Sequence, residues 1–478
     1  MLLLRASRRL QLTPDAVFYR WSGPFIHLER NYMSIRKRSL LATVGVATVS
    51  LLATFVTTVA PADAAINCNK VIGPGYAHLK GKTVTMFTSI LDPELSKYKK
   101  ALASFTTCTG IKIKIEGSNQ FEALLPVRVK GGNAPDLAII PQPGLLAQMV
   151  ATGKAVVAPG KTLANVNKYW SAGWKGYGSV KGKFYAAPNS ANMKSLVWYS
   201  PKQFAKAGYA VPTTWTQMMA LADKMATAKQ TAFCGGIGSG GATGWPATDW
   251  LEEVVVRQFG AKTYADWISH KVKFSDPKII AAMGTVASWM KNPKYVGDVK
   301  AIATTTFQSA GLGIPSASCM MLQQASFYAA QYPAGTDVSK NGDVWAFYLP
   351  GINAAVKTPV EGGGEFFAAF SKRPEVQELQ NYLSTPQYAM NRIATAGAGG
   401  GWLSANSGVP LSAYKNPLDQ LSAKYLADKH STFVFDASDA MPAAVGAGTE
   451  WTQLTSWFAD GKSTVDVAKA IDASWPAS

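Results

Sequence analysis

Histidine and cysteine are scarce in this chain of 478 residues, which contains four of each. The histidines lie far apart in the sequence, and neither residue type occurs at the spacing of a zinc motif such as H-E-x-x-H or C-x-x-C. The sequence therefore offers no support for zinc chemistry, and we expect neither a metal site nor a cofactor.

The motifs of serine hydrolases and of nucleotide-binding enzymes are also lacking. No G-x-S-x-G sequence occurs, and each Gly-Lys-Thr or Gly-Lys-Ser lacks the earlier glycine of a phosphate-binding loop. A glycoside hydrolase needs only two carboxylates, and Asp249, Glu252 or Glu253 would qualify on residue type alone. We expect no catalytic residues, with a secreted glycoside hydrolase as the enzymatic alternative.

Acidic residues are fewer than basic ones, 29 against 47, which gives a formal net charge of +18. The lysines are scattered, and no arginine-rich block or RNA-binding aromatic signature accompanies them. We therefore expect a basic exterior that faces an anionic cell envelope, and no binding to nucleic acid. The apolar content of 47% predicts a globular protein with a large core, and the length exceeds one ordinary domain.

Charge is absent from the segment 40–60, LLATVGVATVSLLATFVTTVA. Arg36-Lys-Arg38 precedes this segment, and Ala62-Asp-Ala64 supplies the small-x-small pattern of a signal-peptidase site. We interpret residues 1–65 as a secretory signal peptide that includes an N-terminal extension, with Met33 as the alternative start. An uncleaved anchor is the other reading, because the apolar run exceeds the roughly 7–15 residues usual in a signal peptide. The protein is expected to be exported to the cell envelope, the periplasm or the outer face of the cytoplasmic membrane.

The cysteines of an exported chain predict disulfides. Cys68, Cys108, Cys234 and Cys319 allow three pairings, and proximity in the sequence favours Cys68–Cys108 with Cys234–Cys319. Asn67 stands where a lipidated cysteine needs a small residue before it, so we favour a Cys68 without a lipid anchor.

The region that follows alternates strand and helix patterns. Strands are expected at 81–90, 111–115 and 136–140, and helices from Asp92-Pro93 to Gly110 and from Phe121 onward. The order β-α-β-α-β predicts a doubly wound α/β lobe, whose ligands gather at the carboxyl ends of the strands. These ends are residues 88–90, 117–120 and 141–144. From residue 201 the chain becomes mainly helical, and no single linker divides it.

Eight short segments, in order over nearly 400 residues, carry a resemblance to a known family. They are 132–136 (GNAPD), 141–144 (PQPG), 182–188 (GKFYAAP), 195–199 (SLVWY), 244–250 (GWPATDW), 324–327 (QASF), 362–366 (GGGEF) and 436–442 (DASDAMP). Together they resemble the extracellular solute-binding proteins of ABC transporters, family 1, of the maltose-binding type, and within it the branch that binds α-glucosides. Cys234 and Cys319 match positions where this branch carries cysteines, which supports their pairing.

The resemblance implies an α/β fold of two lobes, the periplasmic-binding-protein fold of type II, with a doubly wound sheet and flanking helices in each lobe and a hinge between them. Lobe I would comprise 66–190 and 367–405, and lobe II would comprise 191–366 and the C-terminal helices of 406–478, with crossovers near 189–192, near 366–371 and after 401. The implied function is capture of an α-glucoside or related oligosaccharide between the lobes and its delivery to a membrane permease by a monomeric protein. An envelope carbohydrate adhesin is a further alternative.

A sugar presents an apolar C–H face to a flat ring and needs hydrogen bonds for its hydroxyl rim. Trp245 and Trp250 would supply rings in the glycine-rich stretch around 238–250, and Asp249 would accept two hydroxyl hydrogens. The alternative for Trp250 is a core position on a helix that continues beyond it. The other expected contacts each have a structural alternative in a loop, the hinge, a helix cap or the core; they are Gln142, Tyr185, Asn192, Gln324, Glu365, Trp402, Asp436 and Asp439.

Overall fold

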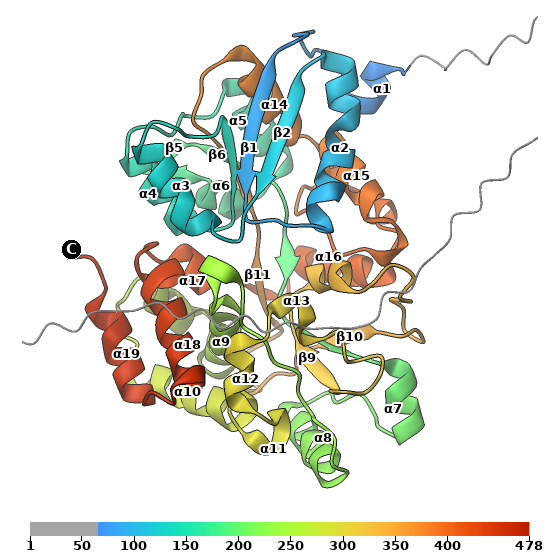
Figure 1. Ribbon diagram of the computed structural model, residues 1–478, viewed down its shortest axis with the longest axis vertical. Helices are drawn as coiled ribbons and strands as arrows, with labels where there is room; N and C mark the ends of the chain where they lie inside the picture. Colours follow the sequence, from blue (N-terminus) through green and yellow to red (C-terminus); the bar gives the residue numbers. More distant parts are fainter. Residues whose placement is uncertain (1–65, 478) are drawn as a thin grey trace, which may run out of the picture. The chain divides into compact units, whose positions relative to one another are not determined.

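The computed structural model describes residues 66–477 of the chain (Figure 1). The expected signal peptide, the alternative start at Met33 and the apolar segment 40–60 lie outside the described residues. Among residues 66–477, no helix combines the length and the apolar character that a membrane span requires.

One lobe, here lobe I, is built on a five-stranded sheet of order β2-β1-β3-β12-β6. Its strands and helices are β1 (Thr83–Thr88), β2 (Lys112–Gly117), β3 (Leu137–Ile140), β4 (Ser179–Val180), β5 (Lys183–Phe184), β6 (Ala186–Pro188), β12 (Phe366–Ala369), α1 (Cys68–Ile72), α2 (Glu94–Thr109), α3 (Phe121–Lys130), α4 (Pro143–Ala151), α5 (Gly160–Tyr169), α6 (Ala172–Tyr177), α14 (Pro374–Leu383) and α15 (Pro386–Ala396). Strands β1, β2 and β3 pair in parallel, as the β-α-β-α-β order predicted.

Lobe I buries apolar residues on both faces of this sheet. Leu137 and Ile139 of β3 belong to one core, whereas Ala138 and Ile140 belong to a second core on the opposite face. Successive side chains of a strand point to opposite faces, so a continuous apolar run is what a doubly covered strand needs. Figure 1 shows α2 and α15 on one side of the sheet and α3 and α4 on the other, with the orange α14 and α15 beside the blue N-terminal elements.

The other lobe, here lobe II, is built on two three-stranded sheets, β10-β8-β9 and β13-β11-β7, and one large core. Its elements are β7 (Asn192–Met193), β8 (Leu196–Tyr199), β9 (Met321–Gln323), β10 (Trp345–Tyr348), β11 (Pro359–Gly363), β13 (Thr432–Phe435), α7 (Pro201–Ala207), α8 (Trp215–Thr227), α9 (Trp245–Ile268), α10 (Pro277–Met290), α11 (Pro293–Val296), α12 (Val299–Thr304), α13 (Phe307–Ala310), α16 (Pro417–Ala427), α17 (Ala437–Ala440), α18 (Trp451–Ala459) and α19 (Thr464–Ala473). Short 3₁₀ or π segments complete the described chain at η1 (Gly240–Ala242), η2 (Ser326–Gln331), η3 (Gly397–Gly399), η4 (Leu411–Ala413) and η5 (Val445–Glu450). The pairings here are antiparallel except for β11 with β13, so this lobe is mixed rather than parallel.

Helix α9 begins at Trp245, directly after the glycine-rich stretch, so both tryptophans of that stretch are helical. Gly244 precedes it with φ 114°, and a Cβ there would lie 2.3 Å from the carbonyl oxygen of Trp451. Only glycine fits this left-handed conformation and this close approach. The glycine therefore lets the start of α9 pack directly on α18.

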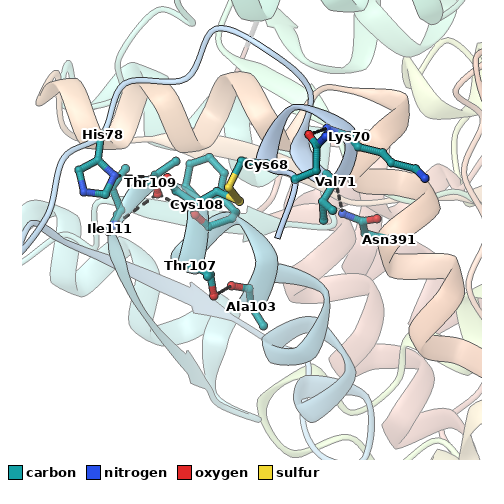
Figure 2. Close-up of a disulfide and its surroundings, with 12 residues drawn as sticks. Cys68, Lys70, Val71, His78, Ala103, Thr107, Cys108, Thr109, Ile111 and Asn391 are labelled. Atoms are coloured by element: carbon teal, nitrogen blue, oxygen red, sulfur yellow. Dashed lines mark hydrogen bonds between the residues drawn. A yellow bond between two sulfur atoms is a disulfide. The ribbon is translucent and has the colours of Figure 1, made fainter. Parts of the chain in front are cut away.

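Two disulfides occur, between Cys68 and Cys108 and between Cys234 and Cys319, the two pairings favoured by the sequence. The Cα atoms are 5.5 Å and 5.4 Å apart, within the ordinary range for a disulfide. Figure 2 shows the first bond joining the short helix α1 to the end of α2, with Asn391 donating to the Val71 carbonyl at 3.0 Å. The bond thus attaches the first described helix to lobe I.

Candidate functional site

A cavity of about 300 Å³ lies between the two lobes, which is the lower end of the usual range for small-molecule sites. Lobe I lines it with residues that follow strand ends, among them Ser89 after β1, Asn119 after β2 and Gln142 after β3. The carboxyl ends of parallel strands meet at one edge of a sheet, which is why these residues converge. The cavity therefore occupies the edge at which the sequence predicted ligand binding.

The segments expected as crossovers also reach the cavity. Residues 190–192 line it, as do Gly364, Glu365, Gly401 and Trp402. Lobe II adds Trp245 from the start of α9, together with the loop that contains Ser239 and Gly240. Both lobes and the segments between them thus contribute surface to one site.

Seven of the eleven expected contact residues line this cavity: Gln142, Asn192, Trp245, Glu365, Trp402, Asp436 and Asp439. The other four lie elsewhere: Tyr185, Asp249, Trp250 and Gln324. Direct ligand contact by any of the eleven remains a prediction.

Trp250 lies in the core of lobe II, with 1% of its surface exposed and its ring 5.5 Å from that of Phe458. A helix turns by about 100° per residue, so positions five apart face different directions. The orientation of α9 that places Trp245 at the cavity therefore buries Trp250. This is the core position that the sequence left open as the alternative for Trp250.

Gln324 and Tyr185 contact other parts of the protein and do not line the cavity. The Gln324 side chain accepts a hydrogen bond from the Ala325 backbone N–H at 2.7 Å, the loop role that the sequence left open. Tyr185 packs against a lobe I core, away from the cavity.

Asp249 lies beneath the cavity, where it pairs with a lysine that the sequence reasoning missed. Lys194 Nζ is 2.6 Å from Asp249 Oδ1 and also pairs with Asp436 Oδ2, and all three side chains are at most 5% exposed. Burial alone would lower the pKa of Lys194, but the carboxylates of Asp249 and Asp436 raise it well above its usual value. A cation could fit among the carboxylate oxygens of Asp249, Glu361 and Asp436, which lie close together. The Lys194 ammonium, paired with two of these carboxylates, already provides the positive charge.

The clue to Lys194 was a single charged residue inside an otherwise uncharged stretch, Met193-Lys-Ser-Leu-Val197. Its Nζ also lies 5.5 Å from the ring centroid of Trp245, within cation–π range. The ion pair thus supports both the acidic floor of the cavity and the aromatic side chain above it.

Trp245 belongs to an aromatic group at the cavity. The ring of Phe307 lies 5.0 Å from it edge-on, and the ring of Phe327 lies 6.0 Å away. Both phenylalanines line the cavity, and neither was expected from the sequence to contact ligand. They come from short helical segments distant in sequence from α9, so local spacing carried no signal for them.

Trp402 is held by a buried hydrogen-bond network. Its Nε1 donates to the Tyr98 hydroxyl at 3.0 Å, and that hydroxyl donates to Glu365 Oε2 at 3.1 Å. Asn189 Nδ2 and Ser190 Oγ donate to the same carboxylate oxygen at 3.0 and 2.5 Å. Trp402 and Glu365 are therefore fixed in orientation at the cavity wall.

A buried cation supports the same wall. The Arg392 guanidinium lies 4.3 Å from the Tyr98 ring centroid and 5.3 Å from that of Trp402. It also donates to Glu94 Oε1 at 3.1 Å, and Glu94 lines the cavity. Burial raises the pKa of Glu94 to about 7, while Arg392 opposes the rise.

Asp436 combines two of the roles considered for it. Its Oδ1 accepts the Asp439 backbone N–H at 2.8 Å and so caps α17, as the structural alternative expected. Its Oδ2 pairs with Lys194, and the residue still lines the cavity. Asp439 lies beside it, 9% exposed, and burial followed by the Asp436 charge raises its pKa well above the usual value.

Asp419 supports the loop that carries Trp402, and we predict that it makes stability depend on pH. Its two carboxylate oxygens accept the Gly401 backbone N–H at 3.0 and 3.1 Å, and burial raises its pKa to about 7. The unfolded chain, with an aspartate pKa of about 3.9, releases this proton first as pH rises, so the free energy of unfolding falls between about pH 4 and pH 7.

Asp419→Asn should weaken that decline by roughly 2 kcal/mol or more, as measured by denaturant unfolding at pH 4 and pH 7. An unchanged difference between the two pH values in the variant would contradict the assignment.

Comparison with known proteins identifies the family. The model of the bacterial extracellular solute-binding protein family matches residues 91–390. The osmoprotective compounds-binding protein GgtB of Synechocystis sp. is 36% identical over 400 residues, 83% of this chain and 93% of that protein. The alpha-glucosides-binding periplasmic protein AglE of Rhizobium meliloti is 33% identical over 409 residues, 83% of this chain and 88% of that protein.

The fold is similar to that of the bacterial solute receptor AcbH, described as exclusive for b-D-galactopyranose, with a TM-score of 0.71. The two are 18% identical, over 82% of this chain and 98% of that one, so this likeness concerns the fold alone. Three observations indicate the same family: two lobes with a cavity between them, a family model that matches most of the chain, and two relatives that align over most of their length. The chain belongs to the family of bacterial extracellular solute-binding proteins.

Proposed function

We propose that this protein captures an α-glucoside or related oligosaccharide for an ABC importer and delivers it to the membrane permease. The observation that carries the proposal is the pairing of aromatic rings with oriented carboxylates in one cavity between two lobes. Trp245 and Trp402 offer flat faces for the C–H surface of a sugar, and Glu365 and Asp439 offer oxygens for its hydroxyls.

Contact between the lobes beside the cavity supports this mode of capture. The Gly241 backbone N–H of lobe II donates to the Asn119 carbonyl of lobe I at 2.7 Å, and a Cβ on Gly240 would lie 2.6 Å from that same oxygen. The glycine-rich stretch therefore lets the two lobes touch at the cavity. A ligand that contacts both lobes stabilises the closed form, which the permease would then recognise.

The ligand class draws on the relatives. AglE is named for α-glucosides and GgtB for osmoprotective compounds, and both match this chain over most of its length. We extend the α-glucoside class to this chain as a proposal. The same proposal includes the predicted lobe boundaries, the export of a monomer by its signal peptide and the absence of a lipid anchor.

The function is tested by titrating the purified protein with maltose, trehalose and sucrose in a calorimeter. We expect one-to-one binding of at least one of them with a Kd of ~10 μM or tighter, together with a smaller radius of gyration in solution scattering. No heat and no compaction with any of the three would contradict the proposal. We also expect the sugar to be recovered intact, and its hydrolysis would favour the glycoside hydrolase instead.

A further inference from the structure

Two side chains that follow β2 and β3, the strands on either side of β1, meet on the lobe I wall of the cavity. Glu122 is the second residue of α3, which follows β2, and Gln142 is the N-cap residue of α4, two positions after the end of β3. Both line the cavity, and Gln142 Nε2 donates to Glu122 Oε1 at 3.3 Å. This bond fixes the orientation of the Gln142 amide, because the opposite orientation would bring two oxygens together.

The pair keeps two acceptor oxygens without donors. Glu122 Oε2 and Gln142 Oε1 are buried atoms that have no hydrogen-bond partner among residues 66–477. Gln142 is 3% exposed, and burial raises the pKa of Glu122. A buried acceptor without a donor costs free energy, so a group that donates to both oxygens would be stabilised there.

The charge of the cavity limits what that group is. Six carboxylates line the cavity: Asp92, Glu94, Glu122, Glu365, Asp436 and Asp439. Among the described lining residues Lys194 is the one basic side chain, and two carboxylates already pair with it. An anionic ligand would therefore find no free cation among these lining residues and would add negative charge beside acidic groups.

We propose that Glu122 and Gln142 form a specificity-determining subsite for a non-anionic ligand group that presents two hydrogen-bond donors. A pair of neighbouring sugar hydroxyls and a sugar ammonium share this chemistry. The inference rests on the proposed sugar-binding function and adds to it the recognition of one face of the ligand. It also assigns a role to Glu122, which the sequence pattern did not single out.

Glu122→Gln tests the carboxylate without changing its size, and Gln142→Ala tests the amide. Each variant should weaken the binding of maltose and trehalose by about ten-fold or more in calorimetry. Gln148→Ala is the matched control, since Gln148 lies exposed on α4 and does not line the cavity. The control should bind as the unaltered protein does, and thermal melting verifies that all three variants are folded.

Three methyl glycosides test the charge preference: methyl α-glucoside, its 2-amino-2-deoxy form and methyl α-glucuronide. For the unaltered protein the glucuronide should bind at least ten-fold more weakly than the neutral glucoside. If the ammonium is the preferred group, the amino glycoside should bind most tightly, and Glu122→Gln should weaken its binding more than that of the other two. If hydroxyls are preferred, the neutral glucoside should bind most tightly, and Glu122→Gln should weaken its binding most.

The subsite is overturned if Glu122→Gln and Gln142→Ala bind maltose and trehalose as tightly as the unaltered protein does. The sugar-binding function would still stand in that case. Equal affinity for the glucuronide and the glucoside would overturn the charge preference. An unaltered protein that binds none of these sugars would overturn the proposed function, and the subsite with it.

Discussion

Replacement of Trp245 by alanine is expected to weaken sugar binding by about 100-fold or more while the protein stays folded. The ring is partly exposed at the cavity, next to Phe307 and Phe327, so its removal deletes a flat aromatic surface that the ligand would contact. Gly244 and Pro246 set the backbone at the start of α9, so the helix does not depend on the indole. Calorimetry with the sugar bound most tightly in the screen measures the loss.

Trp250→Ala is the matched control, the same substitution five residues further along the same helix. Trp250 is fully buried against Phe458, so its truncation should lower the free energy of unfolding by about 3–5 kcal/mol. Trp245→Ala should change that free energy by no more than about 1 kcal/mol. An unchanged affinity in Trp245→Ala would remove this residue from the ligand site.

Replacement of Lys194 by methionine is expected to lower the free energy of unfolding by about 3–5 kcal/mol. The variant keeps the length of the side chain but leaves Asp249 and Asp436 buried without their cation. The loss should be greater at pH 8 than at pH 5, because burial raises the pKa of Asp249 to about 8 and this carboxylate, once it has lost its partner, is protonated at the lower pH. Urea unfolding followed by tryptophan fluorescence measures it.

The double variant Lys194→Met with Asp249→Asn is the control for charge rather than shape. Removing one of the two uncompensated carboxylates should recover part of the lost stability, which a double-mutant cycle quantifies. A loss below about 1 kcal/mol in Lys194→Met, or no recovery in the double variant, would mean that the ion pair does not support the cavity floor.

The local patterns of lobe I were sufficient to predict its first elements. The helix expected to end at Gly110 is α2, which ends there with the glycine in the left-handed conformation, φ 72°. The apolar run before Pro141 is β3, parallel to β1 and buried on both faces. These features depend on residues close in sequence, and for that reason they could be recognised without the fold.

The position of β12 in the lobe I sheet could not be predicted from local patterns. This strand pairs with β3 on one side and β6 on the other, although both precede it by most of the length of lobe II. Pairing between strands distant in sequence leaves no periodic pattern in either one. The resemblance to a two-lobed family implied a crossover in this region, but not the register of Phe366 against Ile140 and Pro188.

The sequence by itself determined the α/β class of the first lobe, the even set of cysteines for two disulfides and the aromatic and carboxylate residue types of a sugar site. Only the tertiary structure decided that Trp245 reaches the cavity while Trp250 is buried, that Asp249 serves Lys194, and that Glu122 joins Gln142 at the wall. The physical reason is that strand and helix periodicity arises within a few residues. The direction of a helix face and the partner of a buried charge depend instead on segments that meet only when the whole chain has folded.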